Sequence, residues 1–285
     1  MALFLFIRYG EDLNMKRVLI IACMLLALVG CSSSSVSNEN TFVVGMECAY
    51  QPFNYQITSP SETAVDLGSG MGYCDGYDVM IASDIAEALG KEVVIKKIAW
   101  DGLQPALDSG EIDAIIAGMT ANESREAGID FTTPYYESAG MVMIVRSDSI
   151  MADFTSINDF AGYNVIGQKN TNYDDVIDQI EGVNHITPKA TYPELVVALQ
   201  NGDADGITAE MPVAEGILSA NKGLSIVVFA EGQGFDVDTT VSIGLKEGTR
   251  GTETFEAIQT ALDNISLETR NTYMANAVAN APVEE

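Results

Sequence analysis

A short polar stretch after an expected buried strand carries the groups that bind a carboxylate. The strand is expected over residues 114–117, and Thr120, the start of a helix and Arg125 follow it. A hydroxyl, the free N–H groups of a helix start and a guanidinium together suit a carboxylate, which Arg holds through two parallel hydrogen bonds. The alternative is a surface ion pair of Arg125 with Glu126 or Asp130.

A second set of polar residues follows two strands that are expected later in the chain. Gln168 lies in the loop after the expected strand 165–167, and a helix is expected to begin at Thr171, where free N–H groups could hold the other side of an anion. Glu210 follows a further strand and could accept an ammonium, unless it only caps the helix that begins near Pro212. An anion site and a cation acceptor in one crevice describe a site for a zwitterion.

Strands and helices alternate along the chain, which predicts a parallel or mixed α/β sheet. Strands are expected over 41–45, 93–98 and 114–117. Helices are expected over 78–89 and 101–107, with Asp78 and Asp101 as candidate N-caps.

A unit of helix, glycine and strand occurs twice, 92 residues apart. Seven identities at this offset indicate two similar lobes, with local convergence as the alternative. Ligands of open α/β sheets lie beyond the carboxyl ends of strands, so Gly118, Thr120 and Glu210 should face a crevice. The matched residues are Leu103, Ala106, Leu107, Gly110, Asp113, Ile115 and Ala117, and Leu195, Ala198, Leu199, Gly202, Asp205, Ile207 and Ala209.

The composition of the chain disfavours several classes of protein. The chain has 285 residues, 47% of them apolar, and a formal net charge of -27. The apolar content is enough for one or two cores, and the negative field disfavours nucleic acid. Four cysteines and one histidine, His185, stand in no metal-ligand spacing, so we expect no metal and no cofactor and assign His185 no role.

The N-terminal segment is expected to be an export signal. Lys16 and Arg17 precede a 12-residue apolar run over 18–29, which is too short to span a bilayer. Leu28-Val29-Gly30-Cys31 resembles the lipobox of bacterial lipoproteins, which implies an acylated Cys31, a leader over 1–30 and a flexible tether over 31–40. An ordinary secretory signal is the alternative, and Met15 rather than Met1 is the expected start.

Five motifs in order resemble the polar amino-acid-binding proteins of bacterial ABC importers, the extracellular solute-binding proteins of family 3. The resemblance runs from about residue 41 to 273. The motifs are VGMECAYQPF (44–53), GYD (76–78), WDGLQPAL (100–107), GMTANESR (118–125) and IDFTTPYY (129–136).

The resemblance implies an α/β, two-lobed fold of the type II periplasmic-binding-protein class. One lobe would comprise residues 41–136 plus 240–285, and the other residues 137–239. Two hinge crossings, near 136–139 and 238–240, would let the lobes close around a ligand.

The same resemblance implies roles for individual residues. Arg125 would hold the ligand α-carboxylate with the backbone of Thr120, Thr171 and Asn172. Glu210, the Thr120 hydroxyl and the Gly118 carbonyl would take the α-ammonium. Relatives usually carry Asp at the position of Glu210, and Gly at the position of Asn170, where Asn tolerates a positive φ.

The ligand side chain would lie between Tyr50 and Trp100, although both aromatic residues could instead be ordinary core. Glu47 would contact its polar end, and Gln168 occupies a variable specificity position. Aromatic faces with one carboxylate favour lysine or arginine, with glutamine next. In an exported protein Cys48 and Cys74 can form a disulfide that encloses the insert 58–72, or remain two free thiols.

The resemblance implies capture of an extracellular amino acid and its delivery to an ABC permease with membrane subunits and cytoplasmic ATPases. We expect a monomer without enzyme activity, exported and anchored in the lipid bilayer through Cys31 at the outer face of the cell membrane or in the periplasm. The alternative is an enzyme on the same scaffold, such as a cyclohexadienyl-type dehydratase with Glu47 or Glu210 as general acid.

Overall fold

A computed structural model describes residues 40–138 and 140–282, which belong to one compact unit. The expected leader 1–30, Cys31 and the tether up to residue 39 lie outside the described residues. Among the described helices, none is long and apolar enough to cross a membrane.

The first lobe is built on a mixed five-stranded sheet in the order β6-β1-β7-β16-β8. β1 (Thr41–Met46) runs parallel to both β6 (Glu92–Lys97) and β7 (Ala114–Ile115). β16 (Gly244–Lys246), from the C-terminal part of the chain, runs antiparallel to β7 and to β8 (Ile129–Phe131). The C-terminal segment therefore completes the lobe that the N-terminal segment begins.

Helices cover this sheet because their apolar faces pack on it. Buried side chains of α2, including Val79, Ile81 and Ile85, join the core with Phe42 and Ile115 from the sheet. The helical elements of the first lobe are α2 (Tyr77–Ala88), the 3₁₀ turn η1 (Trp100–Gly102), α3 (Leu103–Ser109), α4 (Glu123–Glu126), α8 (Glu253–Asn264) and α9 (Leu267–Asn280).

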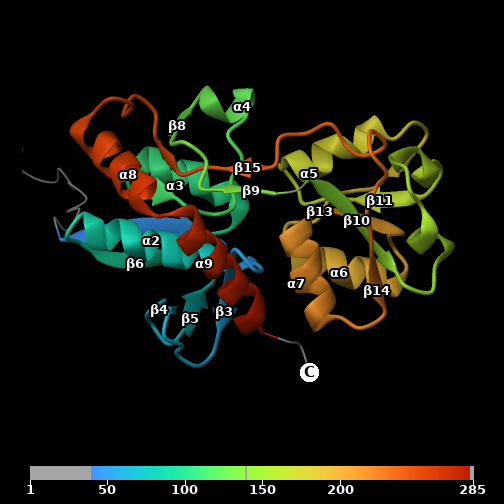
Figure 1. The fold of residues 1–285 in the computed structure, drawn as a ribbon, viewed down its shortest axis with the longest axis horizontal. Coiled ribbons are helices and arrows are strands. Elements are labelled where there is room, and N and C mark those ends of the chain that lie inside the picture. The colour runs from blue at the N-terminus through green and yellow to red at the C-terminus, as the bar shows by residue number, and fades with distance from the viewer. Residues whose placement is uncertain (1–39, 139, 283–285) are drawn as a thin grey trace, which may run out of the picture. The chain divides into compact units, whose positions relative to one another are not determined.

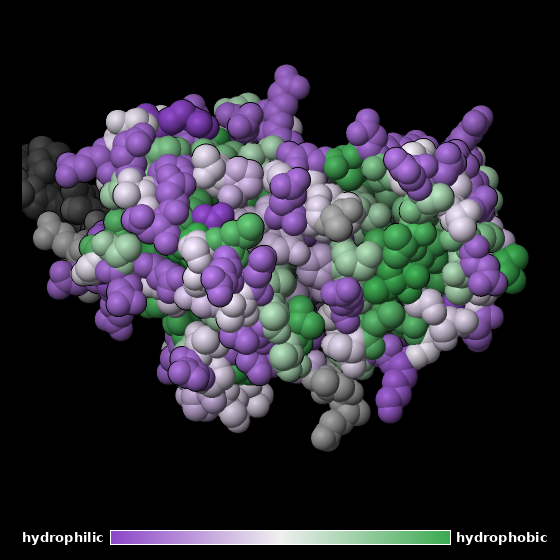
Figure 2. Space-filling view, in the orientation of Figure 1, coloured by the Kyte–Doolittle hydropathy of each residue, from purple (hydrophilic) through white to green (hydrophobic). Residues whose placement is uncertain are grey.

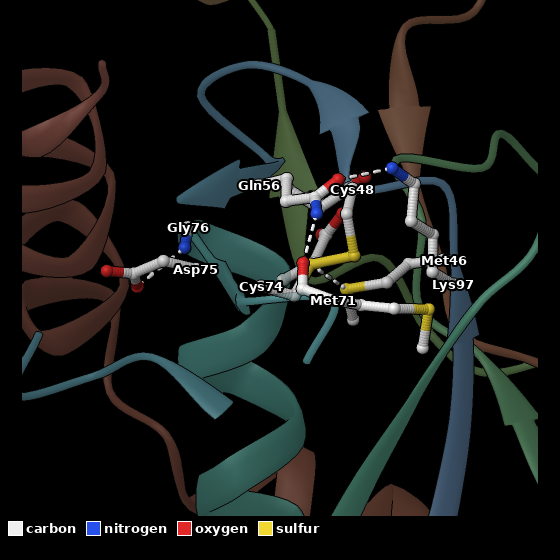
Figure 3. Close-up of a disulfide and its surroundings, with 10 residues drawn as sticks. Met46, Cys48, Gln56, Met71, Cys74, Asp75, Gly76 and Lys97 are labelled. Atoms are coloured by element: carbon white, nitrogen blue, oxygen red, sulfur yellow. Dashed lines mark hydrogen bonds between the residues drawn. A yellow bond between two sulfur atoms is a disulfide. The ribbon is translucent and has the colours of Figure 1, made fainter. Parts of the chain in front are cut away.

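A four-stranded antiparallel sheet extends the first lobe, in the order β2-β3-β5-β4. Its strands are β2 (Ala49–Tyr50), β3 (Asn54–Ile57), β4 (Val65–Asp66) and β5 (Tyr73–Asp75). A disulfide joins Cys48, before β2, to Cys74 in β5, with Met46 beside it (Figure 3). Nearby, Lys97 donates to the Gln56 side chain, which in turn donates to the Met71 carbonyl.

The second lobe repeats this plan with the order β12-β11-β13-β10-β14. β11 is parallel to β12 and β13, whereas β10 is antiparallel to β13 and β14. The strands are β10 (Met141–Arg146), β11 (Asn164–Ile166), β12 (Asn184–His185), β13 (Gly206–Glu210) and β14 (Leu224–Val227). The helical elements are η2 (Ile150–Asp153), η3 (Ile157–Phe160), α5 (Asn172–Asp175), η4 (Val176–Gln179), α6 (Tyr192–Asn201) and α7 (Met211–Ala220).

Two short strands connect the lobes. β9 (Tyr136–Glu137) leads from the first lobe towards β10, and β15 (Thr240–Val241) returns to β16. They pair antiparallel and lie side by side in Figure 1. In Figure 2 hydrophilic residues predominate over the face of the first lobe, whereas hydrophobic residues gather on the lobe that contains α6 and α7.

The repeat seen in the sequence is also a structural repeat. α3 and α6 each end on a left-handed glycine, Gly110 with φ 74° and Gly202 with φ 80°. Asp113 then accepts the Val43 N–H in β1, at 2.8 Å, and Asp205 accepts the Asn164 N–H at the start of β11, at 3.0 Å. Each aspartate ties the strand after the helix to the parallel strand that pairs with it, β1 in the first lobe and β11 in the second.

The two expected N-caps were wrong. α2 begins after Gly76, and Asp78 is buried inside its first turn, where it accepts hydrogen bonds from other elements. α3 begins after Gly102, and Asp101 lies in η1. In both places a glycine takes the N-cap position and leaves the carboxylate free for a tertiary contact.

Candidate functional site

A small cavity lies between the lobes and is partly open to solvent. First-lobe residues line it from the ends of β1 and β7 and from η1, and second-lobe residues line it from the loop after β11 and the start of α5. Both groups lie beyond the carboxyl ends of strands, as expected for open α/β sheets. The lining residues are Glu47, Tyr50, Trp100, Ala117, Gly118, Thr120, Arg125, Gln168, Thr171, Asn172 and Tyr173.

Arg125 presents a partly buried guanidinium to this cavity. The Asn122 side chain caps α4 by accepting the Arg125 N–H at 2.9 Å. Nη1 donates to the Thr120 carbonyl at 2.8 Å, and the guanidinium carbon lies 5.1 Å from the Trp100 ring centroid. Burial lowers the pKa of Arg125. Among the described residues no carboxylate forms an ion pair with Arg125, so the guanidinium can accept an anion from outside the chain.

The surface pairing considered for Arg125 is not formed. Asp130 instead accepts the side chain of Arg250 at 3.4 Å and its backbone N–H at 2.7 Å.

Glu210 ends β13 and is fully buried beside the cavity. Its Oε1 accepts the Tyr50 hydroxyl at 2.5 Å and the Tyr173 hydroxyl at 2.8 Å. Its Oε2 is buried and has no hydrogen-bond partner among the described residues. Burial raises the pKa of Glu210 to about 7. Glu210 occupies the N-cap position of α7, but its side chain makes no capping bond and instead accepts the hydroxyls of Tyr50 and Tyr173, which line the cavity.

Glu47 and Gln168 meet across the cavity from opposite lobes. Gln168 Nε2 donates to Glu47 Oε2 at 3.0 Å and to the Ala190 carbonyl at 2.9 Å. Because both partners are acceptors, the Gln168 amide uses its N–H groups as donors, and the Gln168 amide oxygen remains as an acceptor. Burial raises the pKa of Glu47 to about 7. This end of the cavity therefore offers acceptors to a ligand.

The remaining predicted residues border the same space. Gly118 has φ 62°, and a Cβ there would lie 2.7 Å from the Tyr50 ring, so this position requires glycine. The Thr171 hydroxyl donates to the Gln168 carbonyl at 2.7 Å, and Asn172 accepts the Asn122 amide at 2.7 Å across the lobes. The ring of Tyr50 stacks on Phe53 with centroids 5.3 Å apart, which leaves its other side towards Tyr192 and the cavity.

A buried network of hydrogen bonds supports the cavity wall at Gly118. The Gly118 N–H donates to the Tyr135 hydroxyl at 3.1 Å, and that hydroxyl donates to Asp78 at 2.7 Å. Asn54 also donates to Asp78, at 2.8 Å. Sequence reasoning missed Asp78, Tyr135 and Tyr173. The position of Tyr173, beside the predicted Asn172 at a helix start, was the one available signal.

His185 lies outside the cavity. It stands between Asp178, at 2.9 Å, and Asp174, at 3.0 Å. Burial opposes protonation, but the hydrogen bonds to both carboxylates raise the pKa of His185 above its usual value. The described residues contain no group of three or more His, Cys, Asp or Glu side chains suited to a metal ion.

The comparisons with known proteins agree on one family. Residues 42–269 match the family described as bacterial extracellular solute-binding proteins, family 3. A probable histidine-binding protein of Campylobacter jejuni is 29% identical over 206 residues, which are 72% of this chain and 73% of that protein. An arginine-binding extracellular protein of Bacillus subtilis is 25% identical over 88% of this chain and 93% of its own length.

Solved structures share the fold. An ancestral arginine-binding protein bound to glutamine has a TM-score of 0.69 and 27% identity over 83% of this chain and 97% of its own. An amino acid ABC transporter substrate-binding protein of Streptococcus pneumoniae bound to L-arginine has a TM-score of 0.74 and 23% identity, covering 88% of this chain and 99% of that one.

Proposed function

The chain belongs to the bacterial extracellular solute-binding proteins of family 3, and we propose that its cavity binds an amino acid with a cationic side chain, arginine or lysine, with glutamine next. The observation that carries this proposal is the charge of the cavity. Arg125, whose guanidinium has no carboxylate partner among the described residues, and the buried Glu47 line the cavity, and the buried carboxyl of Glu210 lies behind Tyr50. When both carboxyls are ionised, a ligand with one carboxylate and two cations balances them.

Each charged group of such a ligand has a counterpart. Arg125 and the N–H groups at the start of α5 receive the α-carboxylate. The unpartnered Oε2 of Glu210 receives the α-ammonium. Glu47 and the oxygen of Gln168 receive the side-chain cation at the other end. The arginine- and histidine-binding relatives agree with a basic ligand.

The proposed delivery of the ligand and the proposed location of the protein follow from its family. Its members are extracellular proteins, and the proposed partner of the closed complex is an ABC permease with membrane subunits and a cytoplasmic ATPase. A lipid anchor at Cys31, residence at the outer face of the cell membrane or in the periplasm, and a monomeric state are further parts of the proposal. Mass spectrometry of the purified protein tests the anchor, since an acylated Cys31 would be its first residue.

Calorimetric titration with each common amino acid tests the function. The protein is first unfolded and refolded to remove any ligand carried through purification. We expect a dissociation constant of about 1 μM or tighter for arginine or lysine. Arg125→Ala should abolish binding, whereas Arg250→Ala, which removes a guanidinium outside the cavity, should not. Binding that survives Arg125→Ala would contradict the assigned pose.

A second variant separates cationic ligands from glutamine. Glu47→Gln keeps the size of the side chain but removes its charge, so arginine and lysine should bind at least about tenfold more weakly while glutamine changes little. Equal losses for all three ligands would place Glu47 away from the side-chain cation.

A carboxyl with a pKa of about 7 is also suited to general acid catalysis, and Glu47 and Glu210 both have one. This observation retains the dehydratase as the second candidate. Incubation with a cyclohexadienyl acid decides between them, because turnover with no binding of any amino acid would favour the enzyme. Binding of arginine or lysine without turnover supports the transport receptor.

A further inference from the structure

Asn170 lies in a loop of the second lobe with a left-handed backbone, φ 60°. Glycine is the residue that adopts such a φ without strain. Asn tolerates a positive φ better than most residues but gains nothing from it. Its presence here is explained if its side chain does something that glycine cannot.

The side chain and backbone of Asn170 contact three first-lobe residues at the mouth of the cavity. Nδ2 donates to Asp101 Oδ1 at 2.6 Å. The backbone carbonyl of Asn170 accepts hydrogen bonds from Trp100 Nε1 at 3.0 Å and from Arg125 Nη2 at 3.4 Å. The neighbouring Lys169 Nζ donates to the other oxygen of Asp101 at 2.8 Å. One loop of the second lobe thus holds the aromatic wall, the guanidinium and the rim of the first lobe.

We propose that Asn170 and Asp101 form a latch that holds the two lobes closed over the bound ligand and so sets how slowly the ligand leaves. The inference rests on the proposed capture of an amino acid, but neither side chain needs to touch the ligand. Asn170 is a positioning residue: its carbonyl fixes Trp100 and Arg125, and its amide ties the loop to Asp101. The bond exists only while the lobes are together, so it stabilises the closed form alone.

The two variants that test the latch fit the same backbone. Asn170→Gly retains the carbonyl and the positive φ but loses the donor to Asp101. Asn170→Asp keeps the shape of the side chain but sets a second carboxylate against Asp101. Because glycine adopts this φ without strain, a loss in Asn170→Gly does not come from a strained loop.

The chain has a single tryptophan, Trp100, so its fluorescence reports on the mouth of the cavity. Stopped-flow measurement with arginine should show release about three- to tenfold faster from Asn170→Gly than from the unmodified protein, with association little changed. Asn170→Asp should release arginine faster still, and added salt should reduce the difference between the two variants. Asp101→Ala together with Asn170→Gly should release arginine no faster than Asp101→Ala alone, because both remove the same bond.

A control and a ligand-free measurement complete the test. Glu111→Gln removes an exposed first-lobe pair with Lys96 and should leave release unchanged. Without ligand, acrylamide should quench Trp100 more readily in Asn170→Gly, and more again in Asn170→Asp. Release at the unmodified rate from both variants overturns the latch. If no amino acid binds, the proposed function fails, and the quenching series decides alone: equal quenching in all three proteins overturns the latch.

Discussion

At the scale of single residues, Glu210 is the side chain whose surroundings say most about the ligand. Two tyrosine hydroxyls hold Oε1, and Oε2 is buried with no partner among the described residues. A buried acceptor without a partner costs free energy that a ligand ammonium can recover.

This arrangement predicts unequal effects of two small changes. Glu210→Gln should weaken arginine binding by about 100-fold or more, because the ligand ammonium would be buried without a counter-charge. Tyr173→Phe removes one donor to Oε1 and leaves the charge, so it should cost less than about tenfold. Calorimetry of both variants checks the order, and a larger loss in Tyr173→Phe would mean that the ammonium lies elsewhere.

The two raised carboxyl pKa values predict a dependence of binding on pH. Glu47 and Glu210 each have a pKa of about 7 in the structure, against an ordinary value of 4.5. A cationic ligand binds the ionised carboxylates, so the dissociation constant for arginine should rise as pH falls below about 7, and binding near pH 7 should release protons. Calorimetry in buffers of different ionisation enthalpy measures this release. Proton uptake, or no exchange, would contradict it.

The same pKa values affect the ligand-free fold in the opposite sense. A carboxyl with a higher pKa in the folded state holds its proton more tightly there. Its contribution to the free energy of unfolding is therefore full below 4.5 and declines as pH rises through about 7. Urea unfolding without ligand should show this decline, and Glu47→Gln should reduce it.

Most of the residues that line the cavity could be predicted from the sequence motifs and their order. Nine residues named from the family pattern line the cavity, and Glu210 lies behind Tyr50. What the sequence could not provide was the pairing among them. The contact of Tyr50 with Glu210 joins residues 160 positions apart, and it depends on how the two lobes meet.

At the scale of elements, the helix–glycine–strand unit is the feature that sequence and structure share. Both helix ends use a left-handed glycine, and a Cβ at Gly110 or Gly202 would meet no atom within 4 Å. The cost of replacing either glycine is thus the backbone conformation alone. The pattern was recognisable because its helix spacing and its terminal glycine follow local rules, although its aspartates bond to strands 70 and 41 positions away.

The paired glycines permit a matched test. Gly110→Ala and Gly202→Ala should each lower the free energy of unfolding by about 1 kcal/mol, the cost of a left-handed alanine. Because both positions lie away from the cavity, arginine affinity should not change. Urea unfolding and calorimetry measure the two quantities. A cost above about 2 kcal/mol in one variant would show that the helix ends are not equivalent.

Elements without periodic patterns escaped prediction. The insert 58–72 is rich in small polar residues, and its strand β4 forms only through pairing with β5. The expected caps Asp78 and Asp101 were wrong for a related reason. A local rule places acidic residues at helix starts, but here glycines take those positions and tertiary partners use the carboxylates: Tyr135 and Asn54 for Asp78, and Lys169 and Asn170 for Asp101.

At the scale of the whole molecule, the groups of the proposed binding site are divided between the lobes. The first lobe supplies Arg125 and Glu47, and the second supplies Glu210, Gln168 and the start of α5. No single lobe can neutralise all three charges of a cationic amino acid. Under the proposed function, binding and closure would be coupled, and the paired strands β9 and β15, which belong to neither five-stranded sheet, would be the hinge.

The net charge of the molecule adds a long-range contribution to the rate of capture. A protein with a formal charge of -27 attracts a ligand of net charge +1 from beyond contact distance. The association rate constant of arginine or lysine should therefore fall by a few-fold as ionic strength rises from about 10 to 200 mM, since the screening length shortens from about 30 to below 10 Å. The uncharged ligand glutamine, where it binds, should show little change over the same range. Stopped-flow fluorescence of Trp100 measures both. An arginine association rate that does not respond to salt would mean that the acidic residues screen one another and that capture depends on the cavity alone.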